Sequence, residues 1–332
     1  MSAQPFRFVV LGSGNISRTY FKALAGLENA AVAGLVSRSG KRPDFASPGL
    51  PVFESLTSVN VPFDAVILCT PNGLHHQGAI EAARLGKHVL TEKVLDISRE
   101  HMDAMEEACA KAGVRLAVSF QRRMSPDNAA LKRLLETGAL GRVFAADMRV
   151  KFHRDMNYYG SGEYRGGYGI DGGGAFIQQA AHNADLLCWF FGMPRTVVSM
   201  LGTFTHPIEA EDHGVALLRY PDGMIGTFTA STSTKPGFPT ELEIHSDKGS
   251  LLMRNDEFVT WTMEGVDQPE RAPGFEVHSG SNTAAVADTA GHEAILRDFI
   301  EAVRTNREPA VPAASGRLAT ELILRIYESN LP

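Results

Sequence analysis

Short apolar runs alternate with amphipathic stretches through the first 122 residues of the chain. The apolar runs predict strands, and they cover residues 6–11, 30–36, 63–69, 88–91 and 115–120. The stretches between them space their apolar residues three and four positions apart, as helices do, at residues 16–27, 74–86 and 98–113. Strands that alternate with helices in this way pair side by side in parallel. Residues 1–122 are therefore expected to form an α/β domain around a doubly wound parallel sheet.

The pattern changes after Gln121, where longer β-rich runs follow one further predicted helix. These runs cover residues 143–153, 196–204, 213–231, 240–256 and 257–263. Two of them contain hairpin turns, "YPDGM" at 220–224 and "SDKGS" at 246–250, which join antiparallel strands. Residues 123–332 are thus expected to form a second, α+β domain with an antiparallel sheet and two helices at its end.

Composition and charge exclude several classes of partner. The chain has 32 Lys and Arg against 38 Asp and Glu, so its net charge of −6 does not attract nucleic acid or an anionic membrane. No segment approaches the roughly 18 apolar residues of a membrane span. The three cysteines lie far apart, without the spacing of a disulfide framework. We therefore expect a cytoplasmic protein that binds a small molecule, with no nucleic-acid or membrane partner.

The stretch "VVLGSGNIS" places a glycine turn between the first predicted strand and the first predicted helix. Two glycines at this spacing allow a pyrophosphate to approach the backbone N–H groups at the helix N-terminus, and Ser17 is small enough for the helix to pack on the strand. An ordinary tight loop is the alternative. At the start of a βαβ series the turn favours a Rossmann-type dinucleotide site, formed by Gly12, Ser13, Gly14, Asn15 and Ile16.

The second predicted strand ends in "VSRSGKRP", without the acidic residue that often accepts the ribose hydroxyls of NAD. Ser37 and Arg38 stand in its place. A guanidinium group suits a 2′-phosphate, so this sequence favours NADP, with NAD as the alternative cofactor. A solvated basic loop is the structural alternative.

A predicted helix follows three glycines in "GGGAFIQQAAHNADLLCWFFG", residues 172–192. Gln178, His182 and Asp185 stand at positions i, i+4 and i+7, so that they share one face of a helix with about 3.6 residues per turn. A histidine on this face can take or give the proton of a hydroxyl group. The structural alternative is a buried histidine that is satisfied by Asp185.

The loop before this helix, residues 154–174, contains four of the seven tyrosines. A tyrosine offers an apolar ring and a hydroxyl, which suits a sugar, and the glycines of the loop let it fold closely over a ligand. A disordered or interface loop is the alternative. The expected substrate contacts are Tyr158, Tyr159, Tyr164 and Arg165.

Two other kinds of site are not predicted. His75 and His76 are adjacent, but the second histidine points elsewhere on a helix and no third ligand is placed, so we predict no metal. The chain has no G-x-S-x-G elbow, so hydrolysis through a serine nucleophile is not expected either.

Three further stretches, together with the glycine turn and the His182 helix, resemble the glucose-fructose oxidoreductase / inositol dehydrogenase (Gfo/Idh/MocA) family. They are "CTPNGLHHQGAIEAARLGKHVLTEKV", "AVSFQRRMSP" and "HEAILRDFIEAVRTNREP", and they occur in the family's order. The resemblance implies a Rossmann domain followed by an α+β domain with a large, mostly antiparallel sheet. It also implies NAD(P)-dependent oxidation or reduction of a CH–OH group of a sugar, sugar derivative or cyclitol, by a homo-oligomer such as a dimer or tetramer.

The resemblance implies roles for individual residues as well. Lys93 reaches the reacting oxygen and His182 donates or accepts its proton. The residues expected beside the cofactor are Thr70, Pro71, Asn72, His75, Glu92 and Lys93. Those expected beside the substrate, in addition to the tyrosine loop, are Arg122, Gln178 and Asp185. Two positions depart from the family pattern, because Val94 replaces a proline and Gln178 replaces an aspartate.

Two other functions are compatible with the same fold. One is a regulator that binds a dinucleotide and a partner protein without turnover, although the presence of both Lys93 and His182 argues against it. The other is a glycoside-cleaving enzyme that uses tightly held NAD without net redox change. Co-purification of a stable cofactor would favour the latter.

Overall fold

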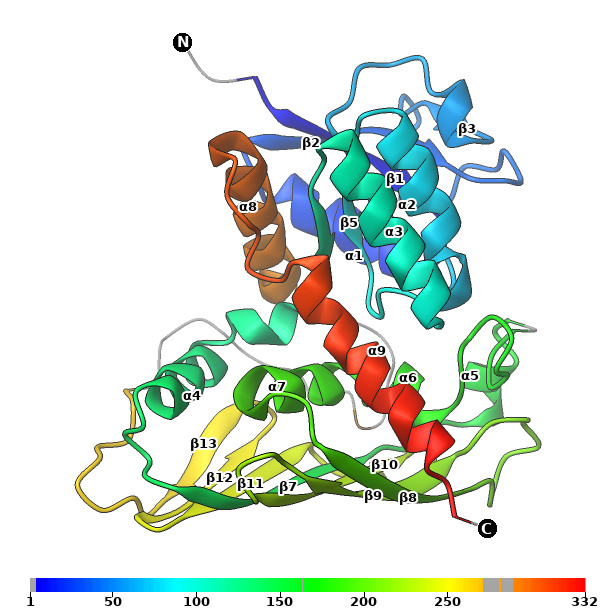
Figure 1. Ribbon diagram of the computed structural model, residues 1–332. Helices are drawn as coiled ribbons and strands as arrows, with labels where there is room; N and C mark the ends of the chain where they lie inside the picture. Colours follow the sequence, from blue (N-terminus) through cyan, green and yellow to red (C-terminus); the bar gives the residue numbers. More distant parts are fainter. Residues whose placement is uncertain (1–3, 163, 271–280, 282–288, 332) are drawn as a thin grey trace. The chain divides into compact units, whose positions relative to one another are not determined.

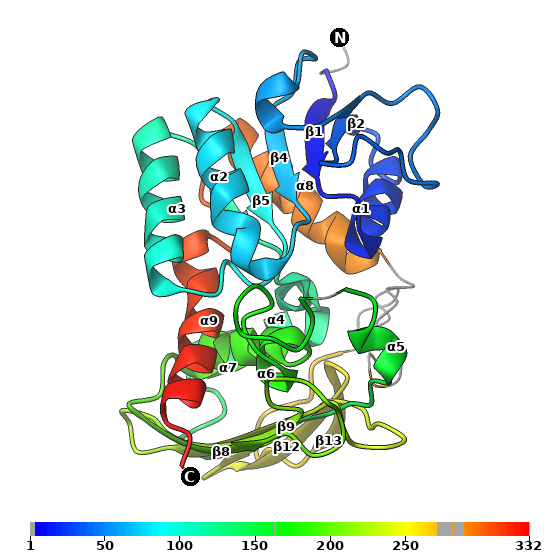
Figure 2. The same ribbon diagram turned by 90° about the vertical axis from the view of Figure 1, so that its right-hand side faces the viewer.

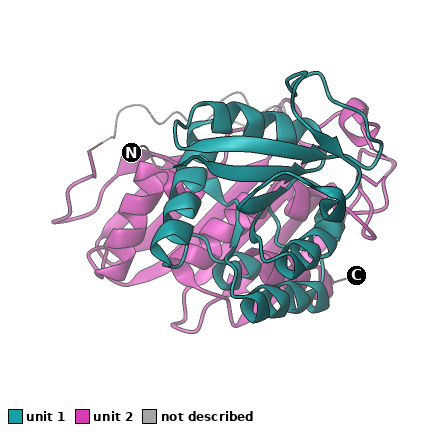
Figure 3. Ribbon diagram, turned by 90° about the horizontal axis from the view of Figure 1, so that it is seen from above, with its two compact units in different colours: residues 1–121, 289–317 teal, residues 122–288, 318–332 magenta. Residues whose placement is uncertain are grey.

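The computed structural model describes residues 4–162, 164–270, 281 and 289–331, which divide into two compact units (Figure 3). Unit 1 contains residues 1–121 and 289–317, and unit 2 contains residues 122–288 and 318–332. We expected residues 289–317 in the second domain, and this expectation is wrong. Helix α8 (Ala290–Thr305) buries Leu296 and Phe299 in unit 1, where the Phe299 ring lies 6.3 Å from that of Phe8.

The core of unit 1 is a six-stranded parallel sheet with the order β3-β2-β1-β4-β5-β6. Its strands are β1 (Phe6–Leu11), β2 (Ala30–Val36), β3 (Val52–Phe53), β4 (Ala65–Leu68), β5 (His88–Thr91) and β6 (Leu116–Val118). The strand order reverses direction between β1 and β4, which pair in parallel. In a sheet of this type ligands bind beyond the carboxyl ends of the strands at such a reversal.

Helices cover both faces of this sheet (Figures 1 and 2). Helices α1 (Asn15–Ala25) and α8 pack on one face, and α2 (His75–Arg84) and α3 (Arg99–Ala112) pack on the other. Short 3₁₀ turns follow β3 and β4, at η1 (Leu56–Ser58) and η2 (Asn72–Leu74). Because both faces are covered, β4 is apolar and buried at each of its positions. The predicted doubly wound parallel sheet is confirmed.

Unit 2 is built on a seven-stranded sheet with the order β13-β12-β11-β7-β10-β9-β8. The strands are β7 (Val143–Lys151), β8 (Thr196–Gly202), β9 (His213–Arg219), β10 (Ile225–Ser231), β11 (Glu241–Ser246), β12 (Gly249–Arg254) and β13 (Glu257–Trp261). Neighbouring strands are antiparallel except β7 and β10, which pair in parallel. The mostly antiparallel sheet expected from the resemblance is thus confirmed.

Helices lie on one face of the second sheet (Figure 1). They are α4 (Pro126–Glu136), α6 (Ala175–Gln178), α7 (Ala181–Phe191) and the part of α9 (Ala313–Glu328) that follows Arg317, while α5 (Met156–Tyr159) belongs to the tyrosine loop. A 3₁₀ turn, η3 (Gln121–Met124), begins at the boundary between the units. The three cysteines are buried and free, and none of the helices in the described ranges is long and apolar enough to cross a membrane.

Candidate active site

The glycine turn between β1 and α1 has the geometry of an anion-binding loop. Gly12 adopts φ = +116°, and an added Cβ would lie 2.5 Å from the carbonyl oxygen of Cys69, so only glycine fits there. An added Cβ on Gly14 would meet no atom of the described residues within 4 Å. Ser17 Oγ donates a hydrogen bond to the Gly12 carbonyl at 2.8 Å, which closes the turn. The N-terminus of α1 is therefore open to a ligand at Gly14.

The carboxyl end of β2 lies beside this turn. Ser37 is buried, and its hydroxyl donates to Ser13 Oγ at 3.4 Å and shares a hydrogen bond with Ser39 at 3.2 Å. Arg38 is exposed. The two segments that sequence analysis assigned to the cofactor thus meet at one edge of the sheet. Ser37 is already engaged within that edge, whereas Arg38 is exposed, as are Lys41 and Arg42 further along the same loop.

His75 was expected beside the cofactor, but the structure places it inside unit 1. The imidazole is fully buried, with Nδ1 2.8 Å from the Val94 carbonyl oxygen and Nε2 3.0 Å from the Thr70 carbonyl oxygen. Burial lowers the pKa of His75 below its usual value. The residue therefore joins the segment after β4 to the segment after β5, and its role is to position them.

Glu92 is also an internal residue where we expected a cofactor contact. Its side chain is buried, and Oε1 accepts a hydrogen bond from the Tyr20 hydroxyl at 2.6 Å. His292 Nε2 on α8 lies 3.8 Å from the same oxygen. Burial, with the Glu92 charge beside it, raises the pKa of Tyr20. Glu92 thus anchors the segment that carries Lys93 to helices α1 and α8.

Lys93 follows directly and is half-buried. Its backbone N–H donates to Glu92 Oε2 at 3.3 Å, and the peptide bond between Lys93 and the buried Val94 is cis. The backbone on both sides of Lys93 is therefore held by Glu92 and His75. Thr70 and Pro71 are half-buried in the neighbouring segment, and Asn72 begins η2.

The helix that was predicted to carry Gln178, His182 and Asp185 on one face is interrupted in the structure. Helix α6 ends at Gln178 and α7 begins at Ala181, with the Ala180 N–H bonded to the Ala175 carbonyl five residues back. The shared face is therefore a wrong prediction. His182 lies half-buried in the first turn of α7, and Gln178 Nε2 donates to the Asp171 carbonyl at 2.9 Å.

Asp185 was expected to contact substrate or to orient His182, but it pairs with Arg123. Arg123 Nε and Nη2 donate to its two carboxylate oxygens at 2.8 and 2.6 Å, and both side chains are buried. Burial raises the pKa of Asp185 to about 6, while the Arg123 charge opposes the rise. The pair joins η3 to α7 inside unit 2. Sequence analysis missed Arg123, because no local pattern distinguishes it from Arg122.

Arg122 itself is tied to residues of unit 2 where we expected a substrate contact. Its Nε lies 3.3 Å from Asp256 Oδ2, and its Nη1 donates to Asn183 Oδ1 at 3.1 Å. The side chain is only 14% exposed. Arg122 therefore supports the packing of η3 against α7 and the turn between β12 and β13.

Two of the three glycines before α6 leave room for other parts of unit 2. Gly172 and Gly173 adopt φ of +86° and +138°. An added Cβ would overlap the Tyr327 hydroxyl at Gly173 and the Glu211 carbonyl oxygen at Gly174. The buried Glu211 carboxylate accepts hydrogen bonds from the N–H groups of Gly174 and Phe176, at 3.0 and 2.9 Å. Burial raises the pKa of Glu211 to about 7.

Tyr158 stands at the centre of a polar network in the tyrosine loop. Its hydroxyl accepts from Gln179 Nε2 at 2.8 Å, and Gln179 Oε1 accepts from Arg154 Nη2 at 2.6 Å. Tyr159, in contrast, is buried and bonds Thr232 Oγ1 at 2.7 Å, so it is a packing residue and the expectation of a substrate contact is not supported. Sequence analysis missed Gln179 and Arg154, which approach Tyr158 from outside its own turn.

Arg165 lies between two aromatic rings of the same loop. The centre of its guanidinium group is 4.5 Å from the Tyr158 ring centroid and 5.7 Å from the Tyr164 ring centroid. Among the described residues Arg165 forms no ion pair, and its buried Nε has no hydrogen-bond partner. The guanidinium therefore lies beside two aromatic rings, without a charged partner among the described residues.

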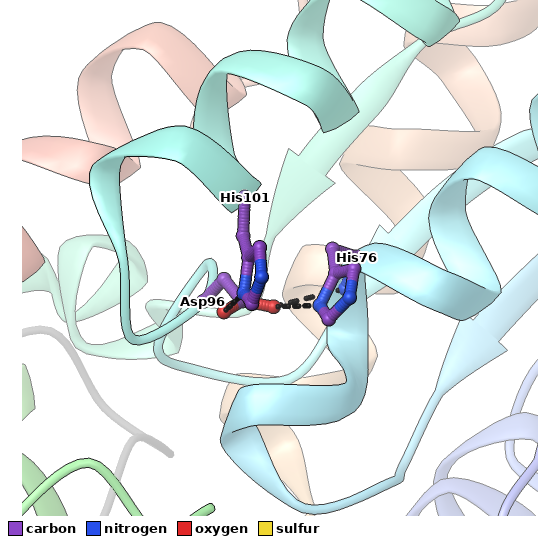
Figure 4. A group of neighbouring side chains, drawn as sticks. All are labelled: His76, Asp96 and His101. Carbon is purple, nitrogen blue, oxygen red and sulfur yellow. Dashed lines mark hydrogen bonds and ion pairs between the residues drawn. The ribbon is translucent and has the colours of Figure 1, made fainter. Parts of the chain in front are cut away.

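The structure brings together three candidate metal ligands that sequence analysis did not connect. His76 was set aside for lack of a third ligand, yet Asp96 and His101 both lie beside it (Figure 4). The fold thus supplies the further ligands that the sequence did not place.

Comparison with known proteins identifies both halves of the chain. The family model "Oxidoreductase family, NAD-binding Rossmann fold" matches residues 6–120, and the model "GFO/IDH/MocA C-terminal domain" matches residues 128–252. The solved structure of the WlbA dehydrogenase from Bordetella pertussis, in complex with NADH and UDP-GlcNAcA, is 30% identical. It aligns with a TM-score of 0.85 over 99% of each chain.

Two curated relatives have similar levels of identity. Oxidoreductase P35 of Formosa agariphila is 29% identical over 55% of this chain, and the match spans 60% of that relative's length. Myo-inositol 2-dehydrogenase of Thermotoga maritima is 26% identical over 77% of this chain and 74% of its own.

Proposed function

Because this chain belongs to the Gfo/Idh/MocA family of NAD-binding oxidoreductases, we propose that it transfers a hydride between a nicotinamide and a carbinol or carbonyl carbon of a sugar, sugar derivative or cyclitol. The observation that carries the proposal is the open glycine turn at the N-terminus of α1, beside the reversal in strand order. The WlbA complex with a sugar nucleotide and the myo-inositol dehydrogenase support these substrate classes.

Several groups of unit 1 are proposed to hold the cofactor. Gly12 shapes the turn, with its own N–H donated to the Val36 carbonyl at 2.9 Å, and the N–H groups from Ser13 to Ile16 are offered to the pyrophosphate. Arg38 lies at the edge where the adenosine ribose would bind. Thr70, Pro71 and Asn72 follow β4, whose carboxyl end borders the same reversal in strand order. When bound, the nicotinamide supplies the hydride acceptor or donor.

Lys93 and His182 are proposed to handle the oxygen and its proton. In the oxidation the hydroxyl proton passes to the His182 imidazole, while the electron pair of the C–H bond leaves with the hydride. The Lys93 ammonium stabilises the negative charge that develops on the oxygen. In the reduction His182 returns the proton. Gln178 is an amide, which cannot take up that proton, and is kept as a proposed substrate contact.

The function is tested by releasing and identifying any nucleotide that co-purifies with the protein. The absorbance of reduced nicotinamide is then followed across a panel of sugars, sugar acids, cyclitols and their keto forms. Turnover of at least one of them with a change in nicotinamide redox state is expected. If the protein binds nucleotide but turns over no member of the panel, the proposed oxidoreductase activity is contradicted.

We propose that NADP is preferred over NAD, because Arg38 is exposed at the end of β2. Arg38→Ala should then weaken NADP binding about tenfold, as expected for loss of a hydrogen-bonded charge partner, with little change for NAD. Titration of each cofactor into both proteins measures the difference.

A control for this titration is Gly14→Ala. An added Cβ there meets no described atom, so folding is preserved, but the methyl group stands at the open turn. It should weaken both cofactors alike, because the pyrophosphate is common to them. Tighter binding of NAD than of NADP by the unaltered protein would contradict the preference.

We further propose that Arg165 binds an anionic group of the substrate, such as the carboxylate of a sugar acid. Its guanidinium group lies beside the Tyr158 and Tyr164 rings and has no ion-pair partner among the described residues. A guanidinium is the side chain best suited to pair with a carboxylate. The network from Arg154 through Gln179 to Tyr158 keeps the first of these rings in place. The UDP-GlcNAcA in the WlbA complex supports an acidic sugar.

Arg165→Ala should raise the Michaelis constant for an acidic sugar about 10–100-fold. A change of this size corresponds to the usual free-energy contribution of hydrogen bonds to a charged group. The Michaelis constant for the matching neutral sugar should change little. Arg195→Ala, which removes an exposed arginine of the same unit, is the matched control. Equal losses for both sugars, or weaker nucleotide binding of the same size, would contradict this role.

A homo-oligomer is also proposed, on the uncovered face of the sheet in unit 2. Strands β8, β9 and β10 present apolar side chains to solvent there. The exposed residues are Val198, Met200, Val215, Leu217 and Ile225. Met200 is paired in register with Val215, and Val198 with Leu217, so these residues form a continuous patch. Patches of this kind mark protein interfaces.

A cytoplasmic location is proposed as well, and the three buried free cysteines support it.

A further inference from the structure

His76, Asp96 and His101 converge where three segments of unit 1 meet (Figure 4). His76 lies in the first turn of α2, Asp96 in the segment after β5, and His101 in the first turn of α3. Asp96 Oδ2 is 3.0 Å from His76 Nδ1, and Asp96 Oδ1 is 2.9 Å from His101 Nδ1. The two imidazole rings stack with centroids 3.6 Å apart. Both Nδ1 atoms are therefore aimed at one carboxylate.

The Asp96 carboxylate is also held by backbone groups, independently of the two imidazole rings. The backbone N–H of His76 donates to Oδ2 at 2.9 Å, and the backbone N–H of Ile97 donates to Oδ1 at 2.7 Å. The buried charge is thus stabilised by the backbone, and each oxygen still has a lone pair directed toward an imidazole. Such outer hydrogen bonds to a carboxylate are typical of metal sites, because they orient the ligand before the ion binds.

We propose that His76, Asp96 and His101 bind a divalent transition-metal ion of the Zn²⁺ type. Two imidazoles and one carboxylate are ligands that Zn²⁺ prefers, with bonds of about 2.0–2.2 Å. When the ion binds, it replaces the proton on each Nδ1 atom. Each imidazole stays neutral, because its single proton moves to Nε2. The Nδ1 to carboxylate separations need to widen by only a few tenths of an ångström.

Exposure of the site allows the ion to enter and the rings to adjust. The His101 side chain is 41% exposed and that of His76 is 18% exposed, whereas Asp96 is fully buried. His101 can therefore turn about its Cβ–Cγ bond, so that its Nδ1 lone pair points at an ion beside Asp96, at the Nδ1 edges of the two rings. Three protein ligands leave one position for water, which reaches the site from the exposed side.

The site lies beside the segment that carries Lys93. His75, adjacent to His76, bonds the Val94 carbonyl, and Asp96 follows two residues later. A bound ion would tie this segment to both α2 and α3, and it would stabilise the folded protein by mass action. This effect concerns unit 1 itself and does not depend on the proposed substrate.

A second cluster provides a comparison within the same chain. Asp147, Glu243 and His245 lie close together on the sheet of unit 2. Residues outside this cluster already bind its side chains, because Arg149 pairs with Glu243, Thr227 donates to Asp147, and His245 Nδ1 bonds Ser250 Oγ at 2.7 Å. An ion there would have to displace an arginine, so we expect the first cluster to bind metal in preference to the second.

The test is titration of Zn²⁺ and Co²⁺ into the full-length protein after dialysis against a chelator. We expect one ion per chain by calorimetry, visible absorption of four-coordinate Co²⁺, and a rise in the unfolding temperature with Zn²⁺. His101→Gln, at the most exposed ligand, should weaken binding by more than about 100-fold, above the usual loss for an outer partner. His76→Gln should do the same.

The control is His245→Gln in the second cluster, which should bind Zn²⁺ and Co²⁺ as the unaltered protein does. Far-ultraviolet circular dichroism checks that each variant is folded. Unchanged affinity in both His101→Gln and His76→Gln overturns the proposal, as does loss of binding in His245→Gln alone. Absence of binding at micromolar metal by the unaltered protein overturns it as well.

Discussion

Replacing His182 by alanine should lower turnover by about 10²–10⁴-fold, which is the usual contribution of a positioned proton-transfer group. Nucleotide binding should survive, because the glycine turn and Arg38 belong to unit 1 and His182 belongs to unit 2. Steady-state rates with a verified substrate, together with nucleotide titration, measure the two effects separately.

The matched control is His213→Ala, which removes another half-buried histidine of the same unit. It should retain the rate of the unaltered enzyme. The pH profile adds a further criterion, because a base that must be unprotonated limits the oxidation on the acid side. The His182→Ala enzyme should lose that acid limb. Full activity in His182→Ala would contradict a catalytic role, and a regulator that binds nucleotide without chemistry would then be the better interpretation.

Lys93→Met should be comparably severe, with a loss of about 10²–10³-fold in turnover. Methionine keeps the length of the side chain but removes the charge that stabilises the developing alkoxide, and loss of one such donor has an effect of this size. Because Lys93 and His182 are proposed to act on one oxygen, the double variant should lose much less than the product of the two single losses. Rate measurements on all four proteins provide the comparison.

Chemical rescue separates a catalytic Lys93 from a structural one. Lys93→Cys can be alkylated with bromoethylamine, which restores an ammonium group at nearly the original length. The native cysteines Cys69, Cys109 and Cys188 are buried, which favours reaction at the new position. We expect the treated protein to regain most of its activity. Inactivity of the correctly alkylated and folded protein would contradict the proposed role of the charge.

Local patterns in the sequence were enough to predict the glycine turn and the strands around it. The strands and the turn at Gly12 and Gly14 depend on residues only a few positions apart in the sequence. The spacing of apolar residues and the presence of turn-forming residues therefore predict them directly. The strand predicted at residues 6–11 is confirmed by β1, which has the same bounds. The antiparallel pairing of strands in the second unit was predicted for similar reasons, from its hairpin turns.

Long-range partners could not be read in the same way. The helical period placed His182 and Asp185 on one face, but Asp185 turns to Arg123, which lies 62 residues earlier in the chain. The break between α6 and α7 follows glycines that pack against Glu211 and Tyr327, which are also remote in sequence. The spacing of apolar residues contains no information about such partners. The predicted helix therefore continued through the break between α6 and α7.

The sequence by itself determined the class of both sheets, the position of the glycine turn and the family to which the chain belongs. Only the tertiary structure decided that His75 and Glu92 support the Lys93 segment from inside, and that α8 returns to unit 1. It alone brought Asp96 and His101 to His76. The physical reason is that burial and pairing depend on distance in space, and the folded chain makes residues neighbours that the sequence keeps apart.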